Sequence, residues 1–261
     1  MSRNNDDKII SIEVPFRSNE WNQYPVGLYR NDVTDPAIAI QQSFERMARL
    51  LPNIKKSTKP LVFNSGYGLA ALFLADKYGC KVECICNSDE TAQVTTDFAK
   101  QFGLDELINI TNCLFDQVPF SGSSFDLVWS MDSMSFNENK PTTLKEVARL
   151  LIPEGRFIFS DYIKSSKSFD DVWIPIESAD RKRQLVTANE YIKLADRADL
   201  ERVYLREDVE QLKQHFSFVK EHLNTSKSPD SQIMDRLVQL QEQLEDQNLS
   251  WGLFQFQKRN D

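Results

Sequence analysis

The sequence has few of the residues from which metal sites and disulfide frameworks are built. It contains four cysteines and two histidines in 261 residues. None of the cysteines forms a C-x-x-C pair; they are Cys80, Cys84, Cys86 and Cys113. Three of them crowd one apolar stretch, which indicates reduced thiols that serve as small hydrophobic groups. We therefore expect no metal site and a cytoplasmic location.

Long apolar runs and positive charge are lacking as well. No run reaches the roughly 18 apolar residues of a membrane span, and the opening stretch MSRNNDDKIISIEVPF has no apolar segment of a secretory signal. The net charge is -8, whereas a general nucleic-acid binder needs a basic surface. We therefore expect a small-molecule partner, no membrane and no nucleic acid. The oligomeric state stays open between a monomer and a homodimer.

The most informative stretch runs from Lys59 to Glu90. Its pattern predicts a strand, a glycine turn, a helix and a second strand, at 60–63, 64–68, 69–78 and 82–86. This is one βαβ unit of a parallel sheet. Ligands of such sheets bind beyond the carboxyl ends of the strands, beside the first strand. Gly66 and Gly68 would let the backbone approach a ligand closely there, next to the unpaired N–H groups of a helix start.

Strands and helices keep alternating as far as Tyr162, which predicts a parallel sheet covered by helices. Asp35-Pro36 is expected to start a helix that runs to about Leu51. The apolar side of that helix is expected to hold Ile38, Phe44, Met47, Leu50 and Leu51. Further helices are expected at 89–101 and 141–151, and further strands at 107–114, 125–130 and 156–162, the last after a turn at 153–155.

The remainder of the chain is more helical. Thr187 and Glu190 have the spacing of a capping box, and a short strand is expected at 203–205. Two long helices are expected at 207–224 and 229–247. An apolar stripe marks the second helix and indicates core packing; it consists of Ile233, Leu237, Leu240 and Leu244. Residues 249–258 alternate like an antiparallel strand.

Three stretches together carry a resemblance: GYGLAALFLADKYGCKV, VPFSGSSFDLVWSMDS and EVARLLIPEGRFIFSDY. They resemble a class I S-adenosylmethionine-dependent methyltransferase, and within that class the sarcosine/dimethylglycine N-methyltransferases. VGLY (Val26 to Tyr29) and WGLFQFQK (Trp251 to Lys258) resemble the first segment and the last strand of that branch. The resemblance implies transfer of a methyl group from S-adenosylmethionine to a small molecule, at an amine nitrogen.

The resemblance also implies an α/β fold: a Rossmann-like, seven-stranded, mostly parallel sheet with helices on both faces and a helical cap. Residues 1–20 would form a loose N-terminal arm. Residues 21–163 would form the core with an N-terminal lid segment, and 164–248 the cap. Residues 249–261 would hold the final antiparallel strand of the core sheet.

Several cofactor positions depart from the family pattern. Val62 stands where the family has an acid in the first strand, and Cys86 where a carboxylate usually binds the ribose hydroxyls. Gln117, beside Asp116, stands where an aspartate contacts the adenine amine. The resemblance assigns the cofactor to Asn64, Gly66, Gly68, Cys86, Asn87, Asp116 and Gln117. These departures keep an alternative open, a methyltransferase fold that has lost methylation and binds or converts another ligand in the same crevice.

The substrate side offers two candidates for catalysis. Asp132 follows a predicted strand, where it is either a site residue or a helix cap or surface residue. His215 and His222 share one helix face, where a histidine is more often structural or solvated; of the two, His215 is the better candidate for a general base. Met131 and several aromatic residues are the candidates for binding the substrate, although each aromatic residue also has a plain packing interpretation: Trp21, Tyr24, Tyr29, Phe136, Trp173 and Phe216.

Overall fold

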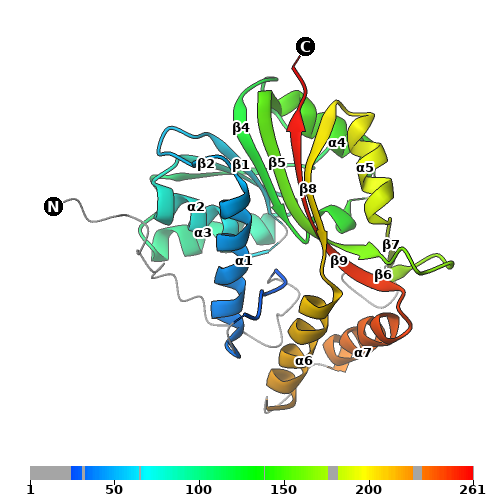
Figure 1. Cartoon of the computed structure of the whole chain (residues 1–261). Helices are drawn as coiled ribbons and strands as arrows, with labels where there is room; N and C mark the ends of the chain where they lie inside the picture. Colours follow the sequence, from blue (N-terminus) through cyan, green and yellow to red (C-terminus); the bar gives the residue numbers. More distant parts are fainter. Residues whose placement is uncertain are drawn as a thin grey trace.

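A seven-stranded sheet runs through the molecule (Figure 1). The computed structural model describes residues 25–30, 33–64, 66–137, 139–175, 182–225 and 231–260. The strands of the sheet are β1 (Pro60–Asn64), β2 (Val82–Cys86), β3 (Ile108–Asn112), β4 (Phe125–Met131), β5 (Leu151–Lys164), β8 (Leu200–Glu207) and β9 (Leu249–Lys258). They lie in the order β3-β2-β1-β4-β5-β9-β8; the pairs from β3 to β5 are parallel, and β9 runs antiparallel to both of its neighbours, β5 and β8. The predicted fold class, including its antiparallel last strand, is confirmed.

Helices cover both faces of this sheet. One face packs against α1 (Pro36–Leu50), α2 (Leu69–Tyr78) and part of α3 (Asp89–Gln101). The other packs against α4 (Lys140–Leu150) and α5 (Ala188–Asp196). Side chains of β1 alternate between the two cores: Val62 joins the first, and Leu61 and Phe63 join the second. A strand buried on both faces reads as a continuous apolar run, which is why β1 and β2 were recognisable from the sequence.

The helix starts follow local sequence signals. Asp35 accepts a hydrogen bond from the N–H of Ala37 at 2.8 Å, with Pro36 at the first helical position. Thr187 and Glu190 form both halves of the predicted capping box. The expected apolar side of α1 is wrong at one position, because Ile38 is 48% exposed. The structure buries Ala39 and Ile40 instead.

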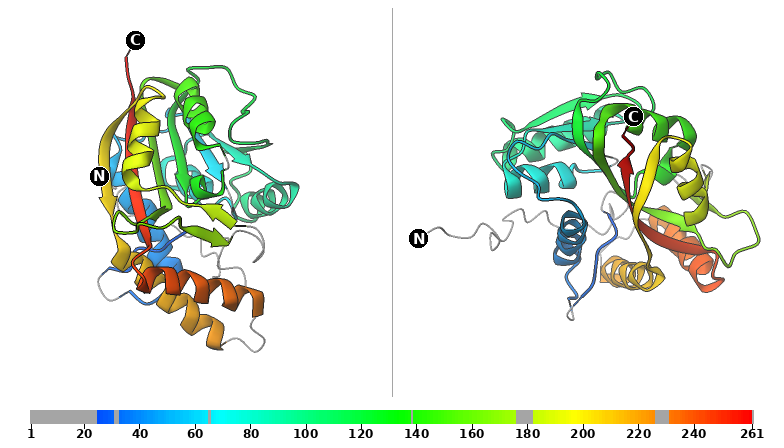
Figure 2. Two further views of the ribbon diagram at one scale, coloured as in Figure 1. Left: turned by 90° about the vertical axis from the view of Figure 1, so that its right-hand side faces the viewer. Right: turned by 45° about the horizontal axis from the view of Figure 1, so that its top comes forward.

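The range expected to form the cap divides into three parts. The β6–β7 hairpin (Trp173–Pro175 and Lys182–Gln184) was not predicted. Helix α5 packs on the sheet, and β8 completes its edge. Only α6 (Val209–Thr225) and α7 (Ser231–Glu245) lie beneath the sheet as a helical pair, as Figure 2 shows. The predicted stripe of α7 is core as expected at Leu237, Leu240 and Leu244.

One predicted turn is corrected by the structure. Residues 153–155 do not precede the fifth strand but lie inside β5, where the pairing with β4 shifts register. Glu154 adopts a positive φ of 63° at this irregularity. The strand is therefore longer than the pattern indicated, and Gly155 marks the bulge rather than the strand start.

Candidate functional site

The candidate site lies at the carboxyl edge of the sheet, the edge at which β1, β4 and β5 end. There the chain leaves β1 at Asn64 and enters α2 at Leu69. Gly68 occupies the position before the helix with φ 73°, in the left-handed region that favours glycine. A Cβ on Gly68 would lie 2.4 Å from Cγ2 of Thr95 on α3. The turn is therefore closed against α3, and only glycine fits there without a shift.

The other predicted cofactor residues follow β2 and β3, next to this turn. Cys86 is fully buried, and its Sγ lies 3.8 Å from the Thr95 hydroxyl. Asn87 is exposed directly after it. Asp116 is half-buried and Gln117 is exposed beyond β3. Polar groups thus stand at the ends of two neighbouring strands, whereas the Cys86 thiol faces protein.

Residues 25–30 have no regular secondary structure and pack against the carboxyl edge of the sheet. We call them the lid segment. The four backbone N–H groups from Val26 to Tyr29 donate to three parts of the fold, two of them to α6. Val26 donates to Asp132 Oδ2 at 2.7 Å and Gly27 to His215 Nδ1 at 3.3 Å. Leu28 donates to the carbonyl of Ala39 and Tyr29 to Gln211 Oε1, both at 2.8 Å. The lid segment therefore joins the end of β4 to α1 and α6, beside which it runs in Figure 2.

Asp132 is the centre of this junction. Besides Val26, the Ser160 hydroxyl and the Trp251 indole N–H donate to its Oδ1, at 2.9 and 2.8 Å. Burial raises the pKa of this carboxyl group, and the three hydrogen bonds oppose that rise. Its φ is 49°, so the chain turns sharply as it leaves β4. Asp132 is thus buried and caps no described helix, which excludes the surface and capping interpretations.

His215 lies on the buried face of α6, fully enclosed. Its Nδ1 accepts the Gly27 N–H, and the Tyr29 hydroxyl lies 3.2 Å from the same nitrogen. Burial lowers the pKa of His215 to about 3. Tyr29 is itself buried and stacks on Phe218, with ring centroids 4.6 Å apart. The structure therefore brings together three predicted residues that are distant in sequence: Tyr29, Asp132 and His215.

A second buried polar cluster was not singled out from the sequence. Asp161, on β5, accepts a hydrogen bond from the Tyr191 hydroxyl at 2.5 Å. Burial raises its pKa to about 7, against the opposing effects of Tyr191, the Lys140 ammonium and the Ser135 hydroxyl. The sequence signal for this cluster was a carboxylate two residues after the apolar run 157–159 of β5. It marks a polar group that the fold carries into the core at the carboxyl edge.

The remaining substrate candidates are placed as follows. Met131 is the buried last residue of β4. Phe136 lies in a short 3₁₀ turn, Met134–Phe136, whose backbone is described. Trp173 lies on β6 and is 47% exposed. Phe216 is buried and stacks on Tyr162 at the end of β5. Trp21 and Tyr24 lie outside the described residues, as does the expected arm of residues 1–20.

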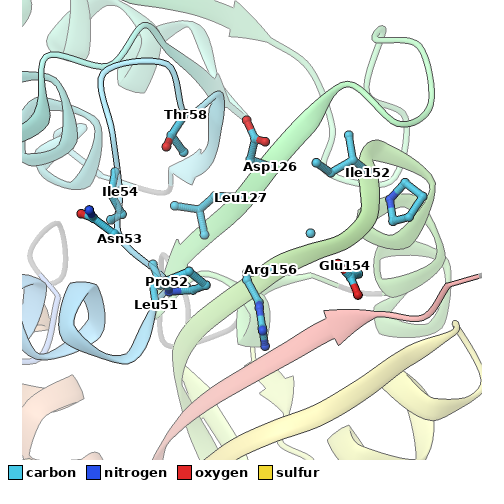
Figure 3. Close-up of a pocket in the computed structure, with 12 residues that line it drawn as sticks. Leu51, Pro52, Asn53, Ile54, Thr58, Asp126, Leu127, Ile152, Glu154 and Arg156 are labelled. Carbon is cyan, nitrogen blue, oxygen red and sulfur yellow. The ribbon is translucent and has the colours of Figure 1, made fainter.

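A cavity of about 290 Å³ opens at the opposite edge, where β4 and β5 begin (Figure 3). Residues 51–54, Thr58, Asp126, Leu127 and 152–156 line it. The Asp126 carboxylate there accepts the Lys59 N–H at 2.8 Å, a contact that fixes the start of β1. None of the predicted site residues lines this cavity, so it is not the candidate site.

The chain is similar to known methyltransferases. A family model described as a methyltransferase domain matches residues 61–159. A sarcosine/dimethylglycine N-methyltransferase of Halorhodospira halochloris is 29% identical over 242 residues, which cover 89% of this chain and 87% of that protein. A glycine/sarcosine/dimethylglycine N-methyltransferase of Actinopolyspora halophila is 31% identical over 204 residues, which cover 78% of this chain and 36% of that protein.

A solved structure has the same fold. It is titled a putative sarcosine dimethylglycine methyltransferase from Galdieria sulphuraria, and it superimposes with a TM-score of 0.80 at 24% identity. The match covers 92% of this chain and 94% of that one. Within the part of the chain that the structure describes, no helix is both long and apolar enough to cross a membrane.

Proposed function

Because the chain belongs to the class I S-adenosylmethionine-dependent methyltransferases, we propose that it methylates the nitrogen of a small amine of the sarcosine or dimethylglycine type. The observation that carries this proposal is the extent of the similarity. The methyltransferase domain ends at residue 159, whereas the similarity to the N-methyltransferase of Halorhodospira halochloris spans 242 residues. A span of 89% of this chain extends well beyond residue 159 and includes α6, one of the parts that would enclose a substrate.

The residues at the carboxyl edge fit S-adenosylmethionine with one exception. The closed glycine turn and the start of α2 suit the amino-acid end of the cofactor. Asn87, Asp116 and Gln117 offer acceptors for ribose hydroxyls and the adenine amine. Cys86 is the exception, because its buried thiol faces Thr95 and is a weak acceptor. We propose that Asn87 takes the ribose contact instead.

When bound, S-adenosylmethionine supplies an electrophilic methyl group on a sulfonium. The substrate nitrogen must reach it in line and unprotonated, so that the new N–C bond forms as the C–S bond breaks. This chemistry asks the protein mainly for position and exclusion of water. The lid segment provides both, since its amides anchor it to β4, α1 and α6. We propose that Asp132, whose oxygens are occupied by protein donors, acts as a positioning residue that holds this lid.

The first test is calorimetric titration with S-adenosylmethionine and S-adenosylhomocysteine, followed by a methylation assay with sarcosine and dimethylglycine. We expect micromolar cofactor binding and transfer to at least one amine. Asn87→Ala should weaken binding several-fold, while Asn53→Ala at the opposite edge should not. An absence of heat at millimolar cofactor would contradict the proposal and leave the interpretation as a fold that has lost methylation.

A further inference from the structure

His215 holds a hydrogen-bond donor that has no acceptor in the part of the chain that the structure describes. A backbone N–H can only donate, so the Gly27 contact at 3.3 Å requires that Nδ1 carries no proton. The Tyr29 hydroxyl, at 3.2 Å, then also donates to this nitrogen. In a neutral ring the remaining proton lies on Nε2. The contacts of the lid segment therefore select one tautomer.

That Nε2–H has no partner among the residues that the structure describes. The atom is buried and makes no hydrogen bond there, and the whole side chain is fully enclosed. Leaving a buried donor unpaired costs about 1–3 kcal/mol, and most buried polar groups in proteins are paired. A group of this kind can bind an acceptor that a ligand brings, provided that it lies beside the candidate site.

The position of His215 relates this donor to the candidate site. Gly27, which binds its Nδ1, adjoins Val26, which binds Asp132 at the end of β4. The next residue on α6, Phe216, stacks on Tyr162 at the end of β5. The buried face of α6 thus lies over the carboxyl ends of the two strands beside which a methyl acceptor would bind.

We propose that the Nε2–H of His215 donates a hydrogen bond to a carboxylate oxygen of the substrate. His215 is then not a general base. This rests on the proposed function. A ring that is already protonated on Nε2 cannot accept a proton there. A donor aimed at the reacting nitrogen would occupy the lone pair that attacks the methyl group. The donor must therefore serve another atom of the substrate, and it selects amines that carry a carboxylate over amines that lack one.

The tautomer can be tested without activity, by NMR of the protein labelled with ¹⁵N-histidine. The chain has two histidines, so a His222→Gln variant assigns the signals. We expect a protonated Nε2 and an unprotonated Nδ1 at His215, unchanged between about pH 5.5 and 8.5. A proton on Nδ1, or a ring that titrates in this range, would overturn the proposal even if methylation is observed.

The donor role is tested with two substrates, dimethylglycine and N,N-dimethylethylamine, which lacks the carboxylate. His215→Leu should lower kcat/KM for dimethylglycine by roughly 10- to 100-fold, the range for a hydrogen bond to a charged acceptor. It should lower the activity toward N,N-dimethylethylamine no more than Gln211→Ala does, because each substitution removes one anchor of the lid segment, and it should leave the affinity for S-adenosylhomocysteine unchanged. His215→Gln, which keeps an N–H donor, should restore part of the loss and covers the case that the leucine variant does not fold.

Gln211→Ala is the matched control. Gln211 lies one turn earlier on α6 and accepts the Tyr29 N–H, so its loss loosens the lid segment but leaves the donor in place. If Gln211→Ala reproduces the effect of His215→Leu, or if His215→Leu affects both amines equally, His215 is only structural and the proposal fails. If the wild-type chain binds no cofactor, the proposed function fails first, and the proposal for His215 fails with it.

Discussion

Asp132 shows how one carboxylate can organise a site without touching the reacting atoms. It accepts hydrogen bonds from Val26, Ser160 and Trp251, which come from the lid segment, β5 and β9. Asp132→Asn replaces one acceptor oxygen with a donor that would face another donor. We expect the free energy of unfolding to fall by roughly 2–3 kcal/mol, measured by urea denaturation. Asp126→Asn, at the opposite edge with one backbone contact, should cost less; equal losses would contradict the role given to Asp132.

The buried carboxyl group of Asp161 should make the stability of the folded chain depend on pH. Its pKa is about 7 in the folded chain because of burial, and about 4 when unfolded. Since the folded pKa is the higher one, its contribution to stability is full below about pH 4 and is lost as the pH rises to about 7. Stability of the wild type relative to Asp161→Asn should therefore fall by roughly 2–4 kcal/mol between these values. Urea unfolding of both chains across this range is the measurement, with the exposed Asp105→Asn as control; a constant difference would be evidence against a raised pKa.

The sequence could place single residues at strand ends but not name their partners. Asp132 was recognisable because it follows an apolar strand at the edge where ligands bind. Its partner Val26 lies 106 positions away, and Gly27 lies 188 positions from His215. Such contacts depend on how the lid segment and α6 pack, which no local pattern contains. The protonation of His215 follows from those contacts, so it also required the structure.

At the scale of elements, the turn between β1 and α2 depends on one glycine. Gly68→Ala would place a methyl group 2.4 Å from Thr95 Cγ2 and force an alanine to φ 73°. We expect the free energy of unfolding to fall by roughly 2–4 kcal/mol, from the contact and the left-handed backbone together. The affinity for S-adenosylhomocysteine should fall too, because the turn moves. Urea unfolding and calorimetry measure the two effects.

A second substitution separates the two causes of this loss. Adding Thr95→Ala removes Cγ2 and Oγ1, the two closest atoms, and leaves Cβ at 3.1 Å. The double variant should recover the part due to the contact and retain about 1–2 kcal/mol of backbone strain. Thr95→Ala alone corrects for the lost hydrogen bond to the Thr91 carbonyl. If the double variant recovers nothing, the contact with α3 is not what makes Gly68 necessary.

Elements with local start signals were predicted well, and the others were not. The caps at Asp35 and Thr187 use side chains within three residues of the amides that they bind, so the sequence alone shows them. The β6–β7 hairpin forms in a polar stretch in which apolar and polar residues do not alternate, so the sequence did not indicate strands there. The sequence at the bulge inside β5 was interpreted as a turn, because proline and glycine, here Pro153 and Gly155, are typical of turns when only the local sequence is considered.

At the scale of the whole molecule, the alternation of strands and helices, together with the family resemblance, was enough to predict the fold class. The place of β8 was not predictable in this way, because strand order depends on pairing between distant segments. The expected boundary at residue 164 stays a prediction, although α5 and β8 pack with the sheet rather than with α6 and α7.

The lid segment, the end of β4 and α6 should respond to ligand as one unit. Three of the four amides of Val26 to Tyr29 end on Asp132, His215 and Gln211, so none of these parts can move without breaking bonds to the others. We expect S-adenosylhomocysteine to slow hydrogen exchange in residues 25–30 and 209–225 together with the glycine turn. Residues 51–58, beside the cavity at the opposite edge, should not change. Gln211→Ala should speed exchange in the lid segment while leaving β1 and β2 as in the wild type. Protection confined to the glycine turn would mean that cofactor binding does not reach the lid, and that closure, if it occurs, requires the amine substrate.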